Sequence, residues 1–215
     1  MARKRIKKNL KTKKMKSQSK YIILLVCILA MGSCKEATTP KPRGYFRIDL
    51  PNKEYVSSLN NISDNKTLPL SFEYPKYGSI ELVTDKEMEP GWFNISFPQY
   101  KAKIYFTYKD VNNNLDELME QAYKFNVKNH IIKADAINEQ LISNPEENVY
   151  GMLYNLKGST ATAVQFFVTD SIKHFFRGSL YFESEPNQDS LAPVINFFEQ
   201  DIEHLIETLK WDDKK

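Results

Sequence analysis

The chain has 215 residues, with 30 Lys and Arg against 27 Asp and Glu, which gives a formal net charge of +3. Residues 1–33 carry 10 of the basic residues and no acidic residue, so residues 34–215 carry 20 basic and 27 acidic residues, a net charge of −7. The basic character therefore belongs to the leading segment alone, which argues against a nucleic-acid partner.

The most apolar stretch is "YIILLVCILAMGSC", residues 21–34. Its apolar run, Tyr21–Met31, is about half of the ~20 residues that a membrane-spanning helix needs. A basic head, a short apolar run and small residues before a cysteine are typical of a lipoprotein signal peptide. We therefore expect residues 1–33 to be removed and Cys34 to carry the lipid, of the palmitate type. An uncut signal anchor and a plain secretory signal are the alternatives.

Two further expectations follow from this segment. Met15 opens a compact signal by itself, so translation starts either there or at Met1. The only cysteines are Cys27, which leaves with the signal, and Cys34, so disulfides, Cys-ligated metals and thiol catalysis are excluded from the folded part. Apart from Glu36, no acidic residue occurs between Cys34 and Asp49, which favours a periplasm-facing anchor in the cell envelope. The sequence does not distinguish the inner from the outer membrane.

Residues 34–68 are expected to form a lipidated tether followed by an arm. The stretch "KEATTPKPRG" is typical of an extended linker, because its prolines fix the backbone and oppose helix. The arm, residues 45–68, is expected to pack loosely on its own domain. Arg and Tyr are common interface anchors, so the alternative is a partner-binding segment. The candidate partner-binding residues are Arg43, Tyr45, Phe46 and Arg47.

Residues 69–215 are predicted to form a single α+β domain. Short runs rich in aromatic and β-branched residues, separated by turn-forming residues, predict strands at 70–74, 79–83, 92–97, 101–108, 137–142, 149–156, 162–169 and 174–182. Apolar residues at helical spacing predict helices at 115–125, capped by Asn114 with Glu117, and near 190–210. The order ββββαββββα predicts a single antiparallel sheet of about eight strands covered by two main helices.

Signatures of catalysis are mostly absent. The chain has only seven glycines and no Gly-rich phosphate loop, and its three histidines lack the spacing of a metal site. We therefore expect no enzyme activity, no cofactor and no metal. Asp170, Ser171 and His174 lie close together, but in a turn, where Asp and Ser usually cap backbone groups. A buried Asp170–His174 pair with shifted pKa values would favour an enzyme instead.

Two tripeptides, "DSI" and "DSL", match the Asp-Ser/Thr-aliphatic pattern of O-linked glycosylation in exported Bacteroidetes proteins. Ser171 and Ser190 are the corresponding acceptor candidates. The pattern is short, and an N-cap role explains the second tripeptide equally well.

Three segments carry a family resemblance: "KPRGYFRIDLP", "NVYGMLYNLKGSTATAVQFFVTDS" and "HFFRGSLYFESEPNQDSLAPVINFFEQDIEHLIETLKW". They resemble the gliding motility lipoprotein GldD family of Bacteroidetes. The resemblance implies an envelope lipoprotein required for gliding and tied to type IX secretion, with no established catalytic activity. Only Cys34 takes a defined role from it. The element order is also similar to the PsbP/Mog1-like sandwich.

The function expected from this resemblance is that of a lipid-anchored, non-enzymatic accessory protein. Its partners would be the membrane, through the lipid, and protein subunits of the gliding or secretion machinery, which it would stabilise or assemble. The alternative is a periplasmic lipoprotein that binds a small ligand or glycan through the aromatic strands at 92–97 and 166–182.

Overall fold

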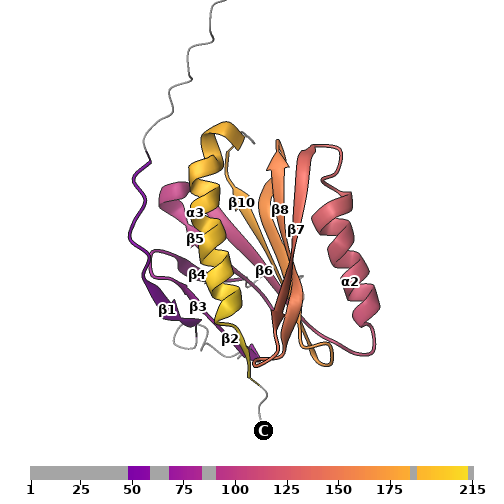
Figure 1. The fold of residues 1–215 in the computed structure, drawn as a ribbon. Coiled ribbons are helices and arrows are strands. Elements are labelled where there is room, and N and C mark those ends of the chain that lie inside the picture. The colour runs from indigo at the N-terminus through magenta and orange to yellow at the C-terminus, as the bar shows by residue number, and fades with distance from the viewer. Residues whose placement is uncertain (1–47, 59–67, 84–90, 185–187, 213–215) are drawn as a thin grey trace, which may run out of the picture. The chain divides into compact units, whose positions relative to one another are not determined.

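The computed structural model describes residues 48–58, 68–83, 91–184 and 188–212 (Figure 1). The expected signal segment, Cys34 and the partner-binding candidates Arg43, Tyr45, Phe46 and Arg47 lie outside these residues. The strands are β1 (Tyr55–Ser57), β2 (Leu70–Ser71), β3 (Glu73–Pro75), β4 (Ser79–Leu82), β5 (Trp92–Phe97), β6 (Ala102–Asp110), β7 (Ala134–Asn144), β8 (Val149–Gly158), β9 (Thr162–Thr169), β10 (His174–Phe182) and β11 (Lys210–Trp211). The helices are the 3-10 turn η2 (Pro98–Tyr100), α2 (Leu115–Tyr123), the π-helical turn η3 (Lys124–Lys128) and α3 (Gln188–Glu207).

Seven strands form one large sheet in the order β4-β5-β6-β10-β9-β8-β7. Every neighbouring pair is antiparallel. β10, which comes last in the sequence among these seven strands, inserts between β6 and β9. The sheet lies between α3 on one face and α2 on the other (Figure 1). The expected α+β class, with one antiparallel sheet and two main helices, is confirmed.

The face under α3 holds the larger core. Residues of β5, β6, β9 and β10 alternate, so that every second side chain points to α3 and is buried. Aromatic rings dominate here: Phe93 and Phe106 have centroids 4.8 Å apart, and Phe106 and Phe176 have centroids 5.3 Å apart. α3 closes this core with Val194, Phe198, Ile202, Leu205, Ile206 and Leu209 just beyond its end.

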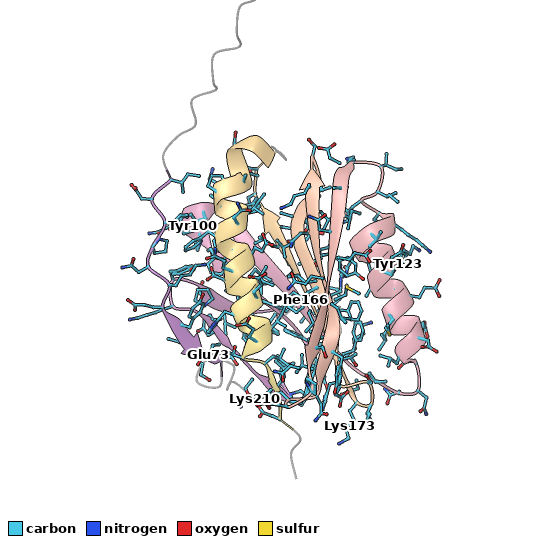
Figure 2. The ribbon with its side chains drawn as sticks, viewed as in Figure 1. Glu73, Tyr100, Tyr123, Phe166, Lys173 and Lys210 are labelled. Carbon is cyan, nitrogen blue, oxygen red and sulfur yellow. The ribbon has the colours of Figure 1, made fainter. Side chains whose placement is uncertain are left out.

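The face under α2 holds a smaller core. Leu118 and Ala122 of α2, with Val127 of η3, pack on residues of β8, β9 and β10. Figure 2 labels Tyr123 on α2, at the opposite side of the molecule from α3. The α2 cap differs from expectation: Asn114 is the N-cap residue, but its Oδ1 accepts from the Asn112 N–H, and Glu117 accepts from Gln121 instead.

One of the expected strands lies outside the large sheet, which is why that sheet has seven strands. The run at 70–74 divides into β2, which pairs with β11, and β3, which pairs with β1. The run therefore pairs with two different strands, β11 and β1. Phe72, which lies between β2 and β3, is buried in the core. β1 itself was not predicted, because a three-residue strand is too short to show alternation.

Candidate functional site

The arm is held on α3 by a buried carboxylate. Asp201, only 1% exposed, accepts hydrogen bonds from Lys53 Nζ at 2.6 Å, Tyr55 Oη at 3.0 Å and Tyr77 Oη. Lys53 Nζ also lies 3.6 Å from the centroid of the Phe197 ring. Burial lowers the pKa of Lys53, against the attraction of Asp201. Residues 53–58 of the arm therefore contribute a buried ion pair and a strand to the domain.

The Asp170 turn is held by backbone hydrogen bonds. Asp170 Oδ1 accepts from the N–H groups of Ile172 at 2.9 Å, Lys173 at 2.8 Å and His174 at 2.8 Å. Burial would raise the pKa of Asp170, but these donors outweigh it and hold that pKa below its usual value. A general base poised near neutral pH needs the opposite shift. The capping interpretation of this turn is confirmed for Asp170.

His174 is packed rather than open to solvent. Its side chain is 4% exposed, its Nδ1 lies 2.7 Å from Tyr108 Oη, and its ring stacks on Trp211 with centroids 5.0 Å apart. Its Nε2 lies 4.0 Å from Asp170 Oδ2. These contacts fit a structural histidine that packs β10 against β11.

The two glycosylation candidates lie in exposed places. Ser171 is exposed in the β9–β10 turn with a φ of 68°. Ser190 is exposed near the start of α3. Glycosylation of either serine remains a prediction.

Four of the aromatic rings expected to line a ligand site are buried in the core. Phe93, Phe97, Phe166 and Phe176 are each at most 1% exposed and belong to the core under α3. Figure 2 labels Phe166 at the centre of the molecule. Aromatic residues at period two indicate a buried face here, and these four rings are not available to a ligand; a site on the remaining aromatic residues of these strands stays a prediction.

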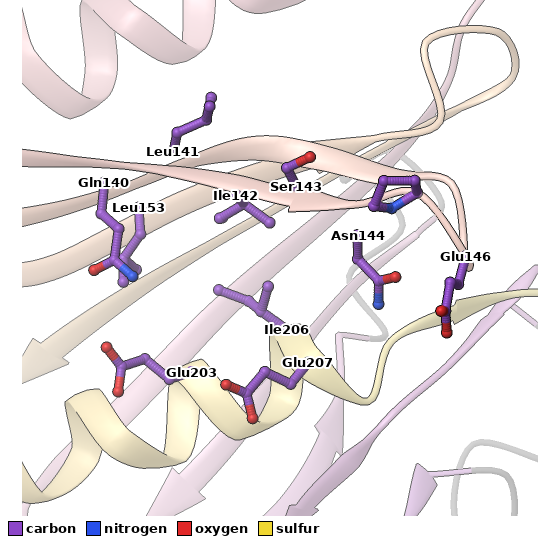
Figure 3. Close-up of a pocket in the computed structure, with 11 residues that line it drawn as sticks. Gln140, Leu141, Ile142, Ser143, Asn144, Glu146, Leu153, Glu203, Ile206 and Glu207 are labelled. Carbon is purple, nitrogen blue, oxygen red and sulfur yellow. The ribbon is translucent and has the colours of Figure 1, made fainter.

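The structure instead has a cleft of about 580 Å³ between the C-terminal half of α3 and the β7–β8 hairpin (Figure 3). Ile142, Leu153 and Ile206 give it an apolar lining. Figure 3 shows Gln140 and Ile142 on the strand side, with Glu203 and Glu207 on the α3 side. An apolar lining with several polar groups around it is the composition of a binding cleft.

The cleft is acidic. Glu199, Glu203 and Glu207 follow one another at four-residue spacing, so they lie along one face of α3. Burial raises the pKa of Glu203, and the charges of Glu199 and Glu207 raise it further. Among the described residues no Lys, Arg or His forms an ion pair with Glu203 or Glu207. This carboxylate row is therefore under mutual repulsion.

β7 borders the cleft and is an edge of the large sheet. Ten of its eleven residues pair with β8 on one side, and no strand of the described part pairs with its other side. Leu141 is 74% exposed on β7, and Ile131 and Ile132 are 64% and 93% exposed just before it. A long edge strand with exposed apolar side chains is a template for pairing with another chain. The sequence predicted this strand but not its place at the edge.

Two other kinds of site were sought in the described part of the chain. No group of three side chains there is placed to hold a metal ion. No helix there is long and apolar enough to cross a membrane.

Comparison with known proteins places the chain in a family. No curated protein matches it. One similar solved structure is that of cyanobacterial PsbP (CyanoP) from Synechocystis sp. PCC 6803, at 11% identity and a TM-score of 0.39, covering 79% of this chain and 98% of that one. Because this TM-score is low, the fold class is taken from the strands and helices described above and not from this similarity. The family model for the gliding motility lipoprotein GldD matches residues 35–211, most of the chain. The chain belongs to the gliding motility lipoprotein GldD family.

Proposed function

We propose that this lipoprotein is a non-enzymatic accessory protein that binds and stabilises components of the gliding and type IX secretion machinery. Lipid on Cys34 holds it at the membrane, facing the periplasm. The partner contributes an extended segment that carries Lys or Arg. The observation that supports this role is that Glu203 and Glu207, which form no ion pair with any described residue, lie beside the edge of β7 that no described strand pairs with.

The edge strand supplies the backbone part of this interaction. The outer N–H and C=O groups of β7 can pair with an extended peptide, as in other complexes formed by strand addition. The side chain of Leu141 offers the partner an exposed apolar contact. Backbone pairing gives affinity without sequence preference, so specificity must come from side chains near the edge.

The glutamates supply that specificity. Burial raises the pKa of Glu203, and the charges of Glu199 and Glu207 raise it further; a cation placed beside Glu203 and Glu207 offsets the part that comes from repulsion. Lys or Arg in the partner therefore binds here better than a neutral residue. Electrostatic complementarity of this kind also speeds association and excludes acidic partners.

The test is crosslinking in living cells followed by pull-down of the lipoprotein. Wild type is compared with Cys34→Ala and with the double variant Glu203→Gln/Glu207→Gln. The matched control is Glu120→Gln, which removes an exposed glutamate from α2 on the other side of the sheet. We expect wild type and the control to capture the same gliding or secretion subunits. The double variant should capture at least tenfold less of them.

Two results would contradict the proposal. Equal capture of these subunits by the double variant removes the cleft from the interaction. Capture of no gliding or secretion subunit by wild type removes the accessory role itself. Loss of capture in Cys34→Ala alone separates the need for the anchor from the need for the cleft.

A further inference from the structure

We propose that Arg177 forms a second binding site, for a carboxylate attached to an apolar group, between the sheet and the π-helical turn η3. This site lies on the α2 face, whereas the acidic cleft is closed by α3. It also has the opposite charge. The proposal is therefore independent of the function proposed for the cleft.

Arg177 lies partly buried in the middle of β10, and its guanidinium faces η3. Its Nε donates to Asn126 Oδ1 at 3.0 Å, and its Nη2 donates to Gln165 Oε1 at 2.8 Å. The Phe125 ring, also on η3, lies over the guanidinium at 5.1 Å from its centroid. Burial lowers the pKa of Arg177 but leaves it charged near neutral pH.

The charge of Arg177 has no carboxylate partner among the described residues. Both of its acceptors are neutral amides, and they use two of its five N–H groups. Buried cations are normally paired with an anion. Residues 34–215 carry 27 acidic residues, so acids are plentiful, yet none of those in the described part of the chain pairs with Arg177.

The two amides add further unpaired donors. Asn126 and Gln165 are both 0% exposed, and neither Asn126 Nδ2 nor Gln165 Nε2 has a hydrogen-bond partner in the structure. Their orientation is fixed, because both oxygens accept from Arg177 and the Gln165 oxygen also accepts from Ser179 Oγ at 3.1 Å. Turning either amide over would set donor against donor. Every unpaired group in this cluster is a donor, so its ligand must be an acceptor.

The surroundings select the kind of acceptor. Phe125 is 47% exposed, and Tyr105 is 46% exposed with its ring edge-on to Tyr181 at 5.4 Å. Tyr181 is four residues after Arg177 on the same face of β10. This aromatic border suits the apolar body of an organic acid and not an inorganic phosphate. A planar guanidinium binds a carboxylate through two parallel hydrogen bonds.

The π-helical turn explains how Asn126 reaches this position. π-helical turns are rare, and they occur frequently at functional sites. Here the turn buries Asn126 and Val127 while leaving Phe125 exposed above the guanidinium.

The test uses benzoate as the probe and the purified full-length protein in mild detergent. Calorimetric titration and thermal unfolding are measured with benzoate, acetate, phosphate and the neutral benzamide. We expect benzoate to bind and to raise the unfolding temperature, acetate to bind more weakly, and benzamide not to bind. Benzamide binding as tightly as benzoate overturns the proposal, and tighter phosphate binding overturns the carboxylate assignment.

Variants locate the site. Arg177→Lys keeps the charge but loses the planar fork, so we expect at least a tenfold loss of benzoate affinity. Lys76→Gln removes an exposed cation that pairs with Glu54 beside β3, outside the large sheet, and should leave the affinity unchanged. Equal affinity in wild type and Arg177→Lys would place benzoate elsewhere.

Asn126→Asp gives a test that does not depend on a destabilised variant. It has nearly the same shape and supplies a carboxylate to Arg177 from within the chain. We expect a higher unfolding temperature and a loss of benzoate binding, because the internal carboxylate takes the place of the ligand. Unchanged benzoate binding together with a lower unfolding temperature contradicts the proposal.

Discussion

The two faces of the large sheet differ in what they bury. Under α3 the sheet buries a continuous set of apolar side chains, with stacked rings at its centre. Under α2 the core is smaller, and next to it lies Arg177 with two amides whose donors are unpaired. Unpaired buried donors cost stability. The α3 face therefore supplies most of the apolar packing and leaves one buried acceptor unpaired, Asn155 Oδ1, whereas the α2 face leaves two buried donors unpaired beside a charge.

Strand β10 contributes to both faces, and neighbouring residues show the contrast. Phe176 and Leu180 point to α3 and are 0% exposed. Phe175 and Arg177 point to the other face. Gly178, on the α3 side, leaves room for the Phe166 ring, since a Cβ there would meet that ring at 2.3 Å.

The largest effect is expected from truncating these neighbouring rings. Phe176→Ala should lower the free energy of unfolding by about 3–5 kcal/mol, because its ring packs on those of Phe93, Phe106 and Phe166. Phe175→Ala should cost less, about 2–3 kcal/mol, because its ring stacks on Phe167 alone among the described aromatics. Urea unfolding monitored by circular dichroism measures both. A larger loss for Phe175→Ala would reverse the ranking of the two faces.

The next effect concerns the charge that the α3 side does bury. Asp201→Asn leaves Lys53 without its anion, and we expect a loss of about 2–4 kcal/mol. The value lies below that of a fully buried pair because the Lys53 side chain is 25% exposed. The matched control is Lys53→Met with Asp201→Asn. It should recover part of the loss in the same urea experiment, and a larger loss in the double variant would show that the pair is not the cause.

Much of this architecture follows from local patterns. The strands at 92–97, 162–169 and 174–182 have the predicted bounds, because alternation and turn residues are visible within each run. The glutamates at 199, 203 and 207 also show their common helical face in the sequence. The sequence does not show that β7 faces these glutamates. The place of β7 at the edge follows from the strand order of the whole sheet, in which β10 lies between β6 and β9.

The Arg177 cluster shows why the rest was not predictable. Its members lie on three elements, with Asn126 51 residues and Gln165 12 residues away from Arg177. Asn126 points inward only because α2 passes into a π-helical turn, and the helical pattern at 115–125 gives no sign of that change. Polar residues brought together by tertiary packing carry no local signal.

A smaller effect is expected at high pH. Burial and the neighbouring Asp201 raise the pKa of Tyr77 above its usual value. The unfolded chain releases this proton first, so the contribution of Tyr77 is intact below pH 10 and is lost as the pH rises further. The expected loss is about 1 kcal/mol per pH unit above 10. Tyr77→Phe should flatten this slope in unfolding measured from pH 9 to 11.5, and an unchanged slope would assign it to other groups.

The smallest effect is expected where the α2 face is open to solvent. Lys103 Nζ lies 2.9 Å from Glu81 Oε2, and this pair holds the pKa of Glu81 below its usual value. Because water screens the pair, Lys103→Gln should cost only about 0.2–1 kcal/mol, and less in 1 M salt. Its part in stability is lost as the pH falls through the lowered pKa of Glu81. A loss as large as that of Asp201→Asn would mean that the Lys103–Glu81 pair is as well shielded from water as the core under α3. The unpaired charge of Arg177 would then be one of several buried charges, and the contrast between the two faces would no longer single it out.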